Sequence, residues 1–139
     1  MITNPFVDYV FINTVYLKTF TIPLIHMTLP LYSAPMNYLS NYLYRHILLN
    51  WGADYAFSEL IRMDRVEQEI KNHKLKYFPE DLSRTIFQVG VSSKKEVSDA
   101  VALIKKQQPR EININMGCPH STMQKKKLCG GILLDKDLM

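Results

Sequence analysis

Apolar and polar positions alternate along most of this chain in a way that predicts strands separated by helices. From residue 29 onward, short apolar runs bounded by turn residues indicate strands at residues 29–34, 54–59, 85–90 and 111–115. Helical spacing of apolar residues marks the segments between them. Strands that alternate with helices at this spacing form βαβ units, so we predict an α/β fold with a parallel sheet.

The first predicted helix follows the strand at residues 29–34, which ends at Pro35 and which we expect to be buried. Its apolar positions are spaced four residues apart: Leu39, Leu43, Ile47 and Trp51. Asn37 or Ser40 can cap its start, and Gly52 is the expected stop.

The later helices carry unequal signals. A weaker helical stretch is marked by Ile61, Val66 and Ile70. The next helix is better defined, because Ser93 and Glu96 have the spacing of a capping box. Its apolar stripe then follows the i, i+3, i+4, i+7 pattern: Val97, Ala100, Val101 and Ile104.

Residues 1–28 form a separate N-terminal extension of unknown role ahead of the domain at residues 29–139. The extension is rich in aromatic and β-branched residues, which predicts one or two strands, arranged as a hairpin packed on the domain. A secretory signal would place positive charge before an apolar run and small residues after it, and this segment does neither.

Amide side chains interrupt two of the predicted strands near their carboxyl ends. Alternation places Asn113 and Asn115 on one face of the last strand, and Gln88 lies near the end of the strand before it. Buried parallel strands are normally apolar on both faces, and ligands bind α/β folds at the carboxyl ends of the strands. A ligand site at this edge is therefore one interpretation. Capping of neighbouring loop backbone by each amide is the other.

A cysteine follows directly after the last predicted strand. Cys118 lies between Gly117 and Pro119, two turn-forming residues that place it on a rigid turn at the same edge. This setting favours chemistry over simple burial, whereas Cys129 is expected to be structural. The two cysteines with one nearby histidine make a poor zinc pattern, so we expect no metal site.

Composition narrows the class of protein. The chain has 139 residues, 47% of them hydrophobic, and a formal net charge of +4, which permits a polyanionic partner without requiring one. Two cysteines are too few for a disulfide framework, so a reducing cytoplasmic setting is expected. No run of 18 uninterrupted apolar residues occurs, so we expect no membrane span. The run of three lysines at residues 125–127 is either a solvated loop or a contact to phosphates.

Four short strings at the predicted strand ends resemble the tRNA-dihydrouridine synthase family. They are Ser33-Ala34-Pro35-Met36, Phe57-Ser58-Glu59-Leu60, Phe87-Gln88-Val89-Gly90 and Asn113-Ile114-Asn115-Met116-Gly117-Cys118-Pro119. The small-residue turn at Gly130-Gly131 also resembles that family. The resemblance covers residues 29–139 and implies an FMN enzyme on a (β/α)8 barrel that uses NADPH to reduce a uracil base in tRNA.

The resemblance also implies roles for individual residues. Cys118 would protonate C5 of the uracil after hydride reaches C6, and Gln88 would bind the polar end of the flavin ring. Asn115 would orient flavin or uracil, and Glu59 would shape the pocket. Pro35, Met36 and Asn37 would lie against the ring and its edge.

These residue types suit the implied chemistry. A thiol has an acidity within reach of neutral pH, and an amide matches the mixed donor and acceptor edge of a flavin or a uracil. A complete barrel needs about 250 residues, however, and the motifs of its later strands are absent from this sequence. We therefore expect a fragment that alone binds FMN weakly or not at all and lacks synthase activity.

Three alternatives remain. Dihydropyrimidine and dihydroorotate dehydrogenases share a flavin barrel and a cysteine in a similar loop, to which Cys118-Pro119-His120 is similar. The chain can also be a non-catalytic RNA-binding relic that uses its basic surface. A plain α/β domain whose motifs only form turns leaves the convergence of Gln88, Asn115 and Cys118 unexplained.

Overall fold

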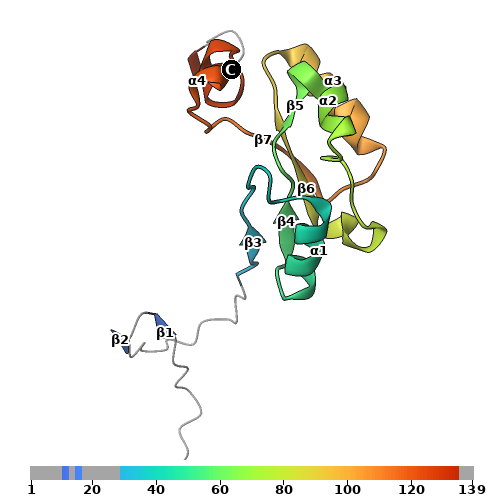
Figure 1. Ribbon diagram of the computed structural model, residues 1–139, viewed down its shortest axis with the longest axis vertical. Helices are drawn as coiled ribbons and strands as arrows, with labels where there is room; N and C mark the ends of the chain where they lie inside the picture. Colours follow the sequence, from blue (N-terminus) through green and yellow to red (C-terminus); the bar gives the residue numbers. More distant parts are fainter. Residues whose placement is uncertain (1–10, 13–14, 17–28, 135–139) are drawn as a thin grey trace, which may run out of the picture.

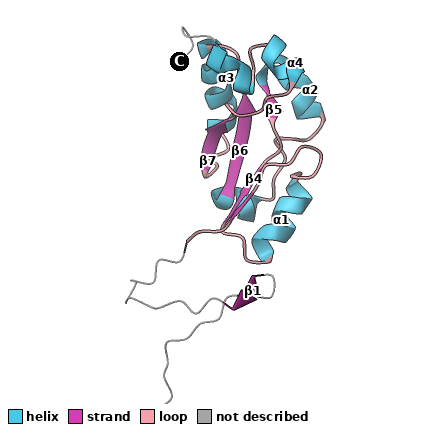
Figure 2. Ribbon diagram, turned by 90° about the vertical axis from the view of Figure 1, so that its left-hand side faces the viewer, coloured by secondary structure: helices cyan, strands magenta, loops and turns pink. Residues whose placement is uncertain are grey.

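A computed structural model of the chain describes residues 11–12, 15–16 and 29–134. Its main feature is a five-stranded parallel sheet with helices around it (Figures 1 and 2). The strands are β3 (Tyr32–Ser33), β4 (Tyr55–Phe57), β5 (Ile61–Arg62), β6 (Thr85–Gly90) and β7 (Glu111–Ile114). The helices are α1 (Tyr42–Asn50), α2 (Val66–Lys71), α3 (Lys94–Lys105) and α4 (Ser121–Lys125), with 3-10 turns at Met63–Arg65, Pro79–Arg84 and Cys129–Leu134.

Strand β6 is the centre of the sheet. It pairs in parallel with β7 along one edge, and with β4 and then β5 along the other, while β3 pairs with β4. All six residues of β6 are buried. Phe87 and Val89 pack into the main core with Ala100 and Ile104 of α3. The register places Gln88 directly beside Asn113 on β7.

The predicted parallel α/β architecture is confirmed. The strands expected at residues 54–59, 85–90 and 111–115 are β4, β6 and β7, and the helix that follows Ser93 is α3. The strand expected at residues 29–34 is shorter, and the prediction that it is buried is wrong. Leu29 and Leu31 are 81% and 61% exposed, because β3 pairs only with β4 within the described part of the chain.

Helix α1 turns a different face to the core than its sequence predicts. Its buried residues are Arg45 and Leu49, and Leu49 packs with Ala53 and Ala56. The predicted core stripe is instead exposed by 43–86%: Leu39, Leu43, Ile47 and Trp51. The cap is Asn41, whose side chain accepts hydrogen bonds from the backbone N–H groups of the first turn.

Two further details differ from the prediction. Ile61 belongs to β5 and not to a helix, because the chain after β4 continues along the same edge of β6. The capping box of α3 is shifted: Ser93 Oγ accepts from Glu96 N, but the Glu96 carboxylate accepts from Ser92 and not from Ser93.

The predicted N-terminal hairpin is confirmed in its two strands. β1 (Phe11–Ile12) and β2 (Val15–Tyr16) pair in antiparallel register. The predicted packing of this hairpin on the domain concerns residues that lie outside the described part of the chain.

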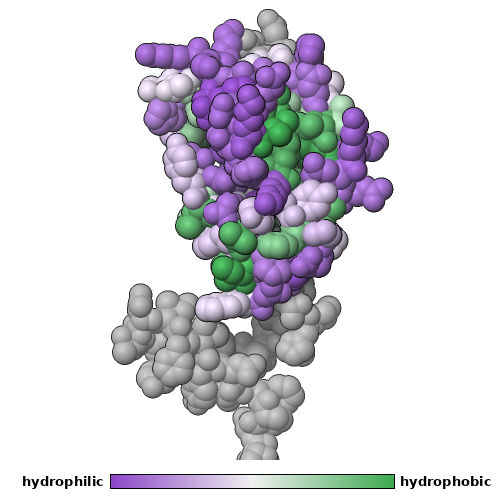
Figure 3. All heavy atoms as spheres, turned by 45° about the vertical axis from the view of Figure 1, so that its right-hand side comes forward, coloured by the Kyte–Doolittle hydropathy of each residue, from purple (hydrophilic) through white to green (hydrophobic). Residues whose placement is uncertain are grey.

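Apolar side chains reach the surface of the domain in patches between hydrophilic areas (Figure 3). Among the helices that the structure describes, none is both long enough and apolar enough to cross a membrane.

Candidate functional site

Backbone and side-chain groups from the ends of four strands are joined at the carboxyl edge of the sheet by a continuous series of hydrogen bonds. Because the strands are parallel, the segments that follow β3, β4, β6 and β7 all leave the sheet at this edge. The predicted site residues lie on these segments.

Three amides connect β6 to β7. Gln88 Nε2 donates to Asn113 Oδ1 at 3.2 Å, and Asn115 Nδ2 donates to Gln88 Oε1 at 3.1 Å. The side chain of Gln88 is only 7% exposed, so its orientation is fixed by these two partners. After both bonds, the Gln88 amide keeps one N–H and one oxygen lone pair for a ligand.

Asn115 also holds the loop that carries the cysteine. Its Oδ1 accepts hydrogen bonds from Gly117 N at 3.0 Å and from Cys118 N at 3.1 Å. Because this oxygen serves two backbone donors, the Nδ2 group must face Gln88. Asn115 therefore makes the loop-capping contact that was the alternative interpretation, and it keeps one N–H for a ligand.

Cys118 lies between β7 and α4 and is half-buried. Its carbonyl oxygen accepts a hydrogen bond from Gly130 N at 3.3 Å, so the last 3-10 turn closes over the cysteine loop. His120 caps α4, because its Nδ1 accepts a hydrogen bond from Thr122 N at 3.2 Å.

The strand β4 extends the series toward β3. Ser58 Oγ accepts from Gln88 N at 2.9 Å and donates to Glu59 O at 2.8 Å. Glu59 Oε1 accepts from Tyr38 N at 2.6 Å. The loop after β3, the end of β4, Gln88 and the cysteine loop are thus one connected polar framework.

The remaining predicted residues lie on the loop after β3. Pro35, Met36 and Asn37 are all exposed, and Met36 N donates to Ser40 Oγ at 2.9 Å. An exposed methionine on a hydrogen-bonded loop offers an apolar contact for a flat ring.

A comparison with known protein families shows to which family the chain belongs. The family model for dihydrouridine synthase matches residues 32–139, which include every strand of the parallel sheet. The chain belongs to the dihydrouridine synthase family. It is also 32% identical over 107 residues to a probable tRNA-dihydrouridine synthase of Aquifex aeolicus (strain VF5). That match covers 76% of this chain and 34% of the relative, so the chain spans about a third of that relative's length.

The family is built on a (β/α)8 barrel, and the parallel strands described here correspond to its first part. In this member of the dihydrouridine synthase family, the hydrogen-bonded residues lie at the carboxyl ends of the strands, which is where (β/α)8 barrels carry their active sites.

Sequence reasoning missed two polar members of the framework. Asn113 was placed on the same face as Asn115 without a role, although the register of β6 and β7 makes it the acceptor for Gln88. Ser58 lies in a string used for the resemblance, but its contact with the backbone of Gln88 depends on the pairing of β4 with β6.

The donor set fits the polar end of a flavin ring. The free N–H and lone pair on Gln88 match a ring edge with both acceptors and donors. Among the described residues, no group of three or more His, Cys, Asp or Glu side chains is placed to hold a metal ion.

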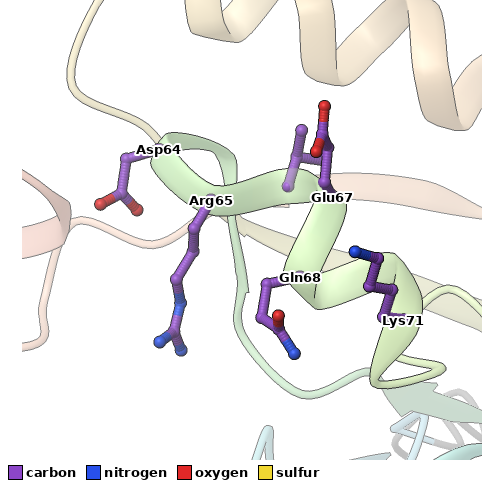
Figure 4. A pocket seen from close by; sticks show the side chains of 6 residues that line it. Asp64, Arg65, Glu67, Gln68 and Lys71 are labelled. Atoms are coloured by element: carbon purple, nitrogen blue, oxygen red, sulfur yellow. The ribbon is translucent and has the colours of Figure 1, made fainter.

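A cavity of about 390 Å³ lies away from these residues, at the start of α2 (Figure 4). It is lined by Asp64, Arg65, Val66, Glu67, Gln68 and Lys71. Lys126 Nζ contacts Asp64 Oδ2 at 2.8 Å, an ion pair that competes with a contact to phosphate, one of the two interpretations of the lysine run.

The two cysteines should differ sharply in reactivity. Burial, with the neighbouring Cys118 as a second cause, raises the pKa of Cys129 from its ordinary value of 9.0 to about 11. At pH 8 the Cys129 thiol therefore stays protonated and its side chain is buried, whereas Cys118 is half-buried. Brief iodoacetamide treatment of the native chain should modify Cys118 alone, as read by peptide mass spectrometry. In urea both cysteines should react, and modification of native Cys129 at the rate of Cys118 would contradict this packing.

Proposed function

We propose that this chain supplies the flavin-facing and proton-donating part of a tRNA-dihydrouridine synthase. The reaction is the FMN-dependent reduction of uridine to 5,6-dihydrouridine in tRNA, with NADPH as the electron donor. The observation that carries the proposal is the series of hydrogen bonds that joins Tyr38, Glu59, Gln88, Asn115 and Cys118.

Cys118 is the proton donor in this proposal. When bound, reduced FMN supplies the hydride that reaches C6 of the uracil. The Cys118 thiol gives a proton to C5, so the C5–C6 double bond becomes a single bond and the cysteine is left as a thiolate. Asn115 Oδ1 accepts hydrogen bonds from the backbone N–H groups of Gly117 and Cys118, and these bonds fix the position of the cysteine that donates the proton.

The other site residues bind and orient the flavin ring. Gln88 presents its remaining N–H and lone pair to the polar end of the ring. Pro35, Met36 and Asn37 lie against its face and edge. The remaining N–H of Asn115 is placed to orient either the ring or the uracil, and Glu59 acts on the loop after β3.

The proposed substrate is a base in tRNA. The name of the Aquifex aeolicus relative supports this choice, as does the formal net charge of +4. A base must leave its stack to reach a flavin inside a barrel, and extruding it costs unstacking energy. A reducing compartment would keep Cys118 as a thiol, so we propose that the enzyme works in the cytoplasm.

We further propose that the site is completed by barrel strands outside these 139 residues. The test is a chimera, called the chimeric barrel below, in which residues 32–139 replace the matching segment of the Aquifex aeolicus relative. The chimeric barrel should bind FMN and form dihydrouridine in tRNA with NADPH, whereas the 139-residue chain alone should form none.

The readout is dihydrouridine measured by mass spectrometry of digested tRNA. A chimeric barrel that folds and reduces free uracil but not tRNA would favour a dihydropyrimidine dehydrogenase-like activity instead. One that binds RNA with no flavin would favour the RNA-binding relic.

A further inference from the structure

The most deeply buried cation near the site is not used by the proposed chemistry. Arg45 on α1 is 1% exposed, and its guanidinium lies 5.8 Å from the centre of the Phe87 ring. Nη1 donates to Ser40 O at 2.7 Å and Nη2 to Lys76 O at 2.5 Å. Burial lowers the pKa of Arg45 to about 10, and the nearby Glu59 and Asp81 carboxylates oppose that shift, so the group remains charged at neutral pH.

Arg45 acts on the loop after β3 through Ser40. Ser40 is completely buried, and its Oγ accepts from Met36 N at 2.9 Å and donates to Ala34 O at 3.2 Å. Ser40 N also donates to Met36 O at 2.9 Å. The serine therefore ties both sides of Met36 to the start of α1, and Arg45 holds the carbonyl of that serine.

Glu59 holds the middle of the same loop from the other side. Glu59 is 7% exposed, and its carboxylate accepts from Tyr38 N at 2.6 Å. Tyr38 has a φ of 65°, a backbone conformation that residues other than glycine and asparagine rarely adopt. The Tyr38 side chain is 88% exposed, so packing of the ring does not account for this conformation. It is held by the bond to Glu59 together with the backbone hydrogen bonds of the turn, from Leu39 N and Ser40 N to Met36 O.

We propose that Ser40, Arg45 and Glu59, here called the loop clamp, are positioning residues that hold residues 34–40 in one conformation before the flavin ring binds. This inference rests on the proposed function, because the loop it holds carries Pro35, Met36 and Asn37. Preorganisation removes the ordering cost that a mobile loop would pay on binding. In this proposal Glu59 binds the backbone of the loop and does not bind the substrate.

Amide hydrogen exchange in the 139-residue chain without flavin tests the clamp directly. The Tyr38 and Met36 amides should be protected in the unsubstituted chain, although their residues are exposed. Glu59→Ala should speed exchange at Tyr38 by about tenfold, and Ser40→Ala should do the same at Met36. The Val89 amide in β6 should be unchanged in both variants, which separates loss of the clamp from global destabilisation.

Matched controls come from exposed residues of the same types. Ser83→Ala and Glu80→Ala lie on the exposed side of a 3-10 turn and should alter neither loop amide. Tyr38 and Met36 amides that exchange at the rate of an unstructured peptide in the unsubstituted chain would overturn the clamp. Protection of Tyr38 in Glu59→Ala and of Met36 in Ser40→Ala that equals the protection in the unsubstituted chain would overturn it as well.

Flavin affinity in the chimeric barrel tests the positioning role. Glu59→Ala should weaken FMN binding by about tenfold, whereas Glu59→Gln, which keeps an oxygen acceptor for Tyr38 N, should stay within about twofold. Equal FMN affinity in the unsubstituted barrel and in Glu59→Ala would overturn the positioning role while leaving the proposed function intact. Absence of FMN binding by the unsubstituted chimeric barrel would instead overturn the proposed function itself.

Discussion

Replacing Cys118 with alanine in the chimeric barrel is expected to abolish dihydrouridine formation without preventing flavin reduction by NADPH. The Cys118 thiol lies on the loop that Asn115 holds, and removing a general acid typically costs about 10²–10⁴ in rate. Flavin reduction should proceed at the rate of the unsubstituted protein, because the alanine removes no contact that we assign to the ring. Stopped-flow absorbance should therefore show rapid reduction with NADPH and no reoxidation by tRNA.

The matched control for this experiment is the second cysteine. Cys129 is buried and lies outside the polar framework, so Cys129→Ala should leave the rate of product formation close to that of the unsubstituted barrel. Product formation at an undiminished rate in Cys118→Ala would remove this cysteine from the proposed mechanism.

Gly130→Ala should displace the cysteine loop and destabilise the chain. A Cβ at this position would lie 2.8 Å from Cys118 O and 3.3 Å from Cys118 C, and both of these are backbone atoms with little room to move. Overpacking of this kind costs about 1–3 kcal/mol in the free energy of unfolding, which a urea titration followed by circular dichroism can measure.

Gly117, on the cysteine loop itself, provides the comparison. A Cβ on Gly117 would meet no atom within 4 Å, so Gly117→Ala should change the free energy of unfolding by less than about 0.5 kcal/mol. Equal stability of the two variants would mean that the last 3-10 turn does not close over Cys118.

Segments with a strong local signal could be predicted from the sequence. β6 was predicted at the residues where it lies, because β-branched and aromatic residues dominate this short run, which is bounded by turn signals. α3 was predicted from a serine cap and a regular apolar stripe, and two members of that stripe, Ala100 and Ile104, are buried. In these segments the local pattern and the packing agree.

The inward face of α1 could not be predicted in this way. An apolar stripe at four-residue spacing indicates a helix, but it does not show which neighbour the helix will meet. In the structure the helix packs through Leu49 and through Arg45, a residue that hydropathy assigns to the surface. Its burial depends on two carbonyl partners that are distant in sequence or lie in a loop.

The residues of the candidate site also fall into two groups, those predictable from a single segment and those that depend on strand pairing. Alternation along the strands, together with the parallel sheet, was enough to bring Gln88, Asn115 and Cys118 to one edge, where hydrogen bonds connect them. The contribution of Asn113 depends on the register between β6 and β7, and that of Ser58 on the pairing of β4 with β6. Neither pairing is encoded within a single segment.

The FMN affinity of the chimeric barrel with and without the Gln88 amide tests the central claim most directly. Gln88→Ala should raise the dissociation constant for FMN by about five- to tenfold, the loss expected for one or two hydrogen bonds, as measured by quenching of flavin fluorescence. Gln124→Ala, on the exposed side of α4, should leave the constant unchanged. An unchanged FMN affinity in Gln88→Ala would contradict the placement of the flavin at this edge of the sheet.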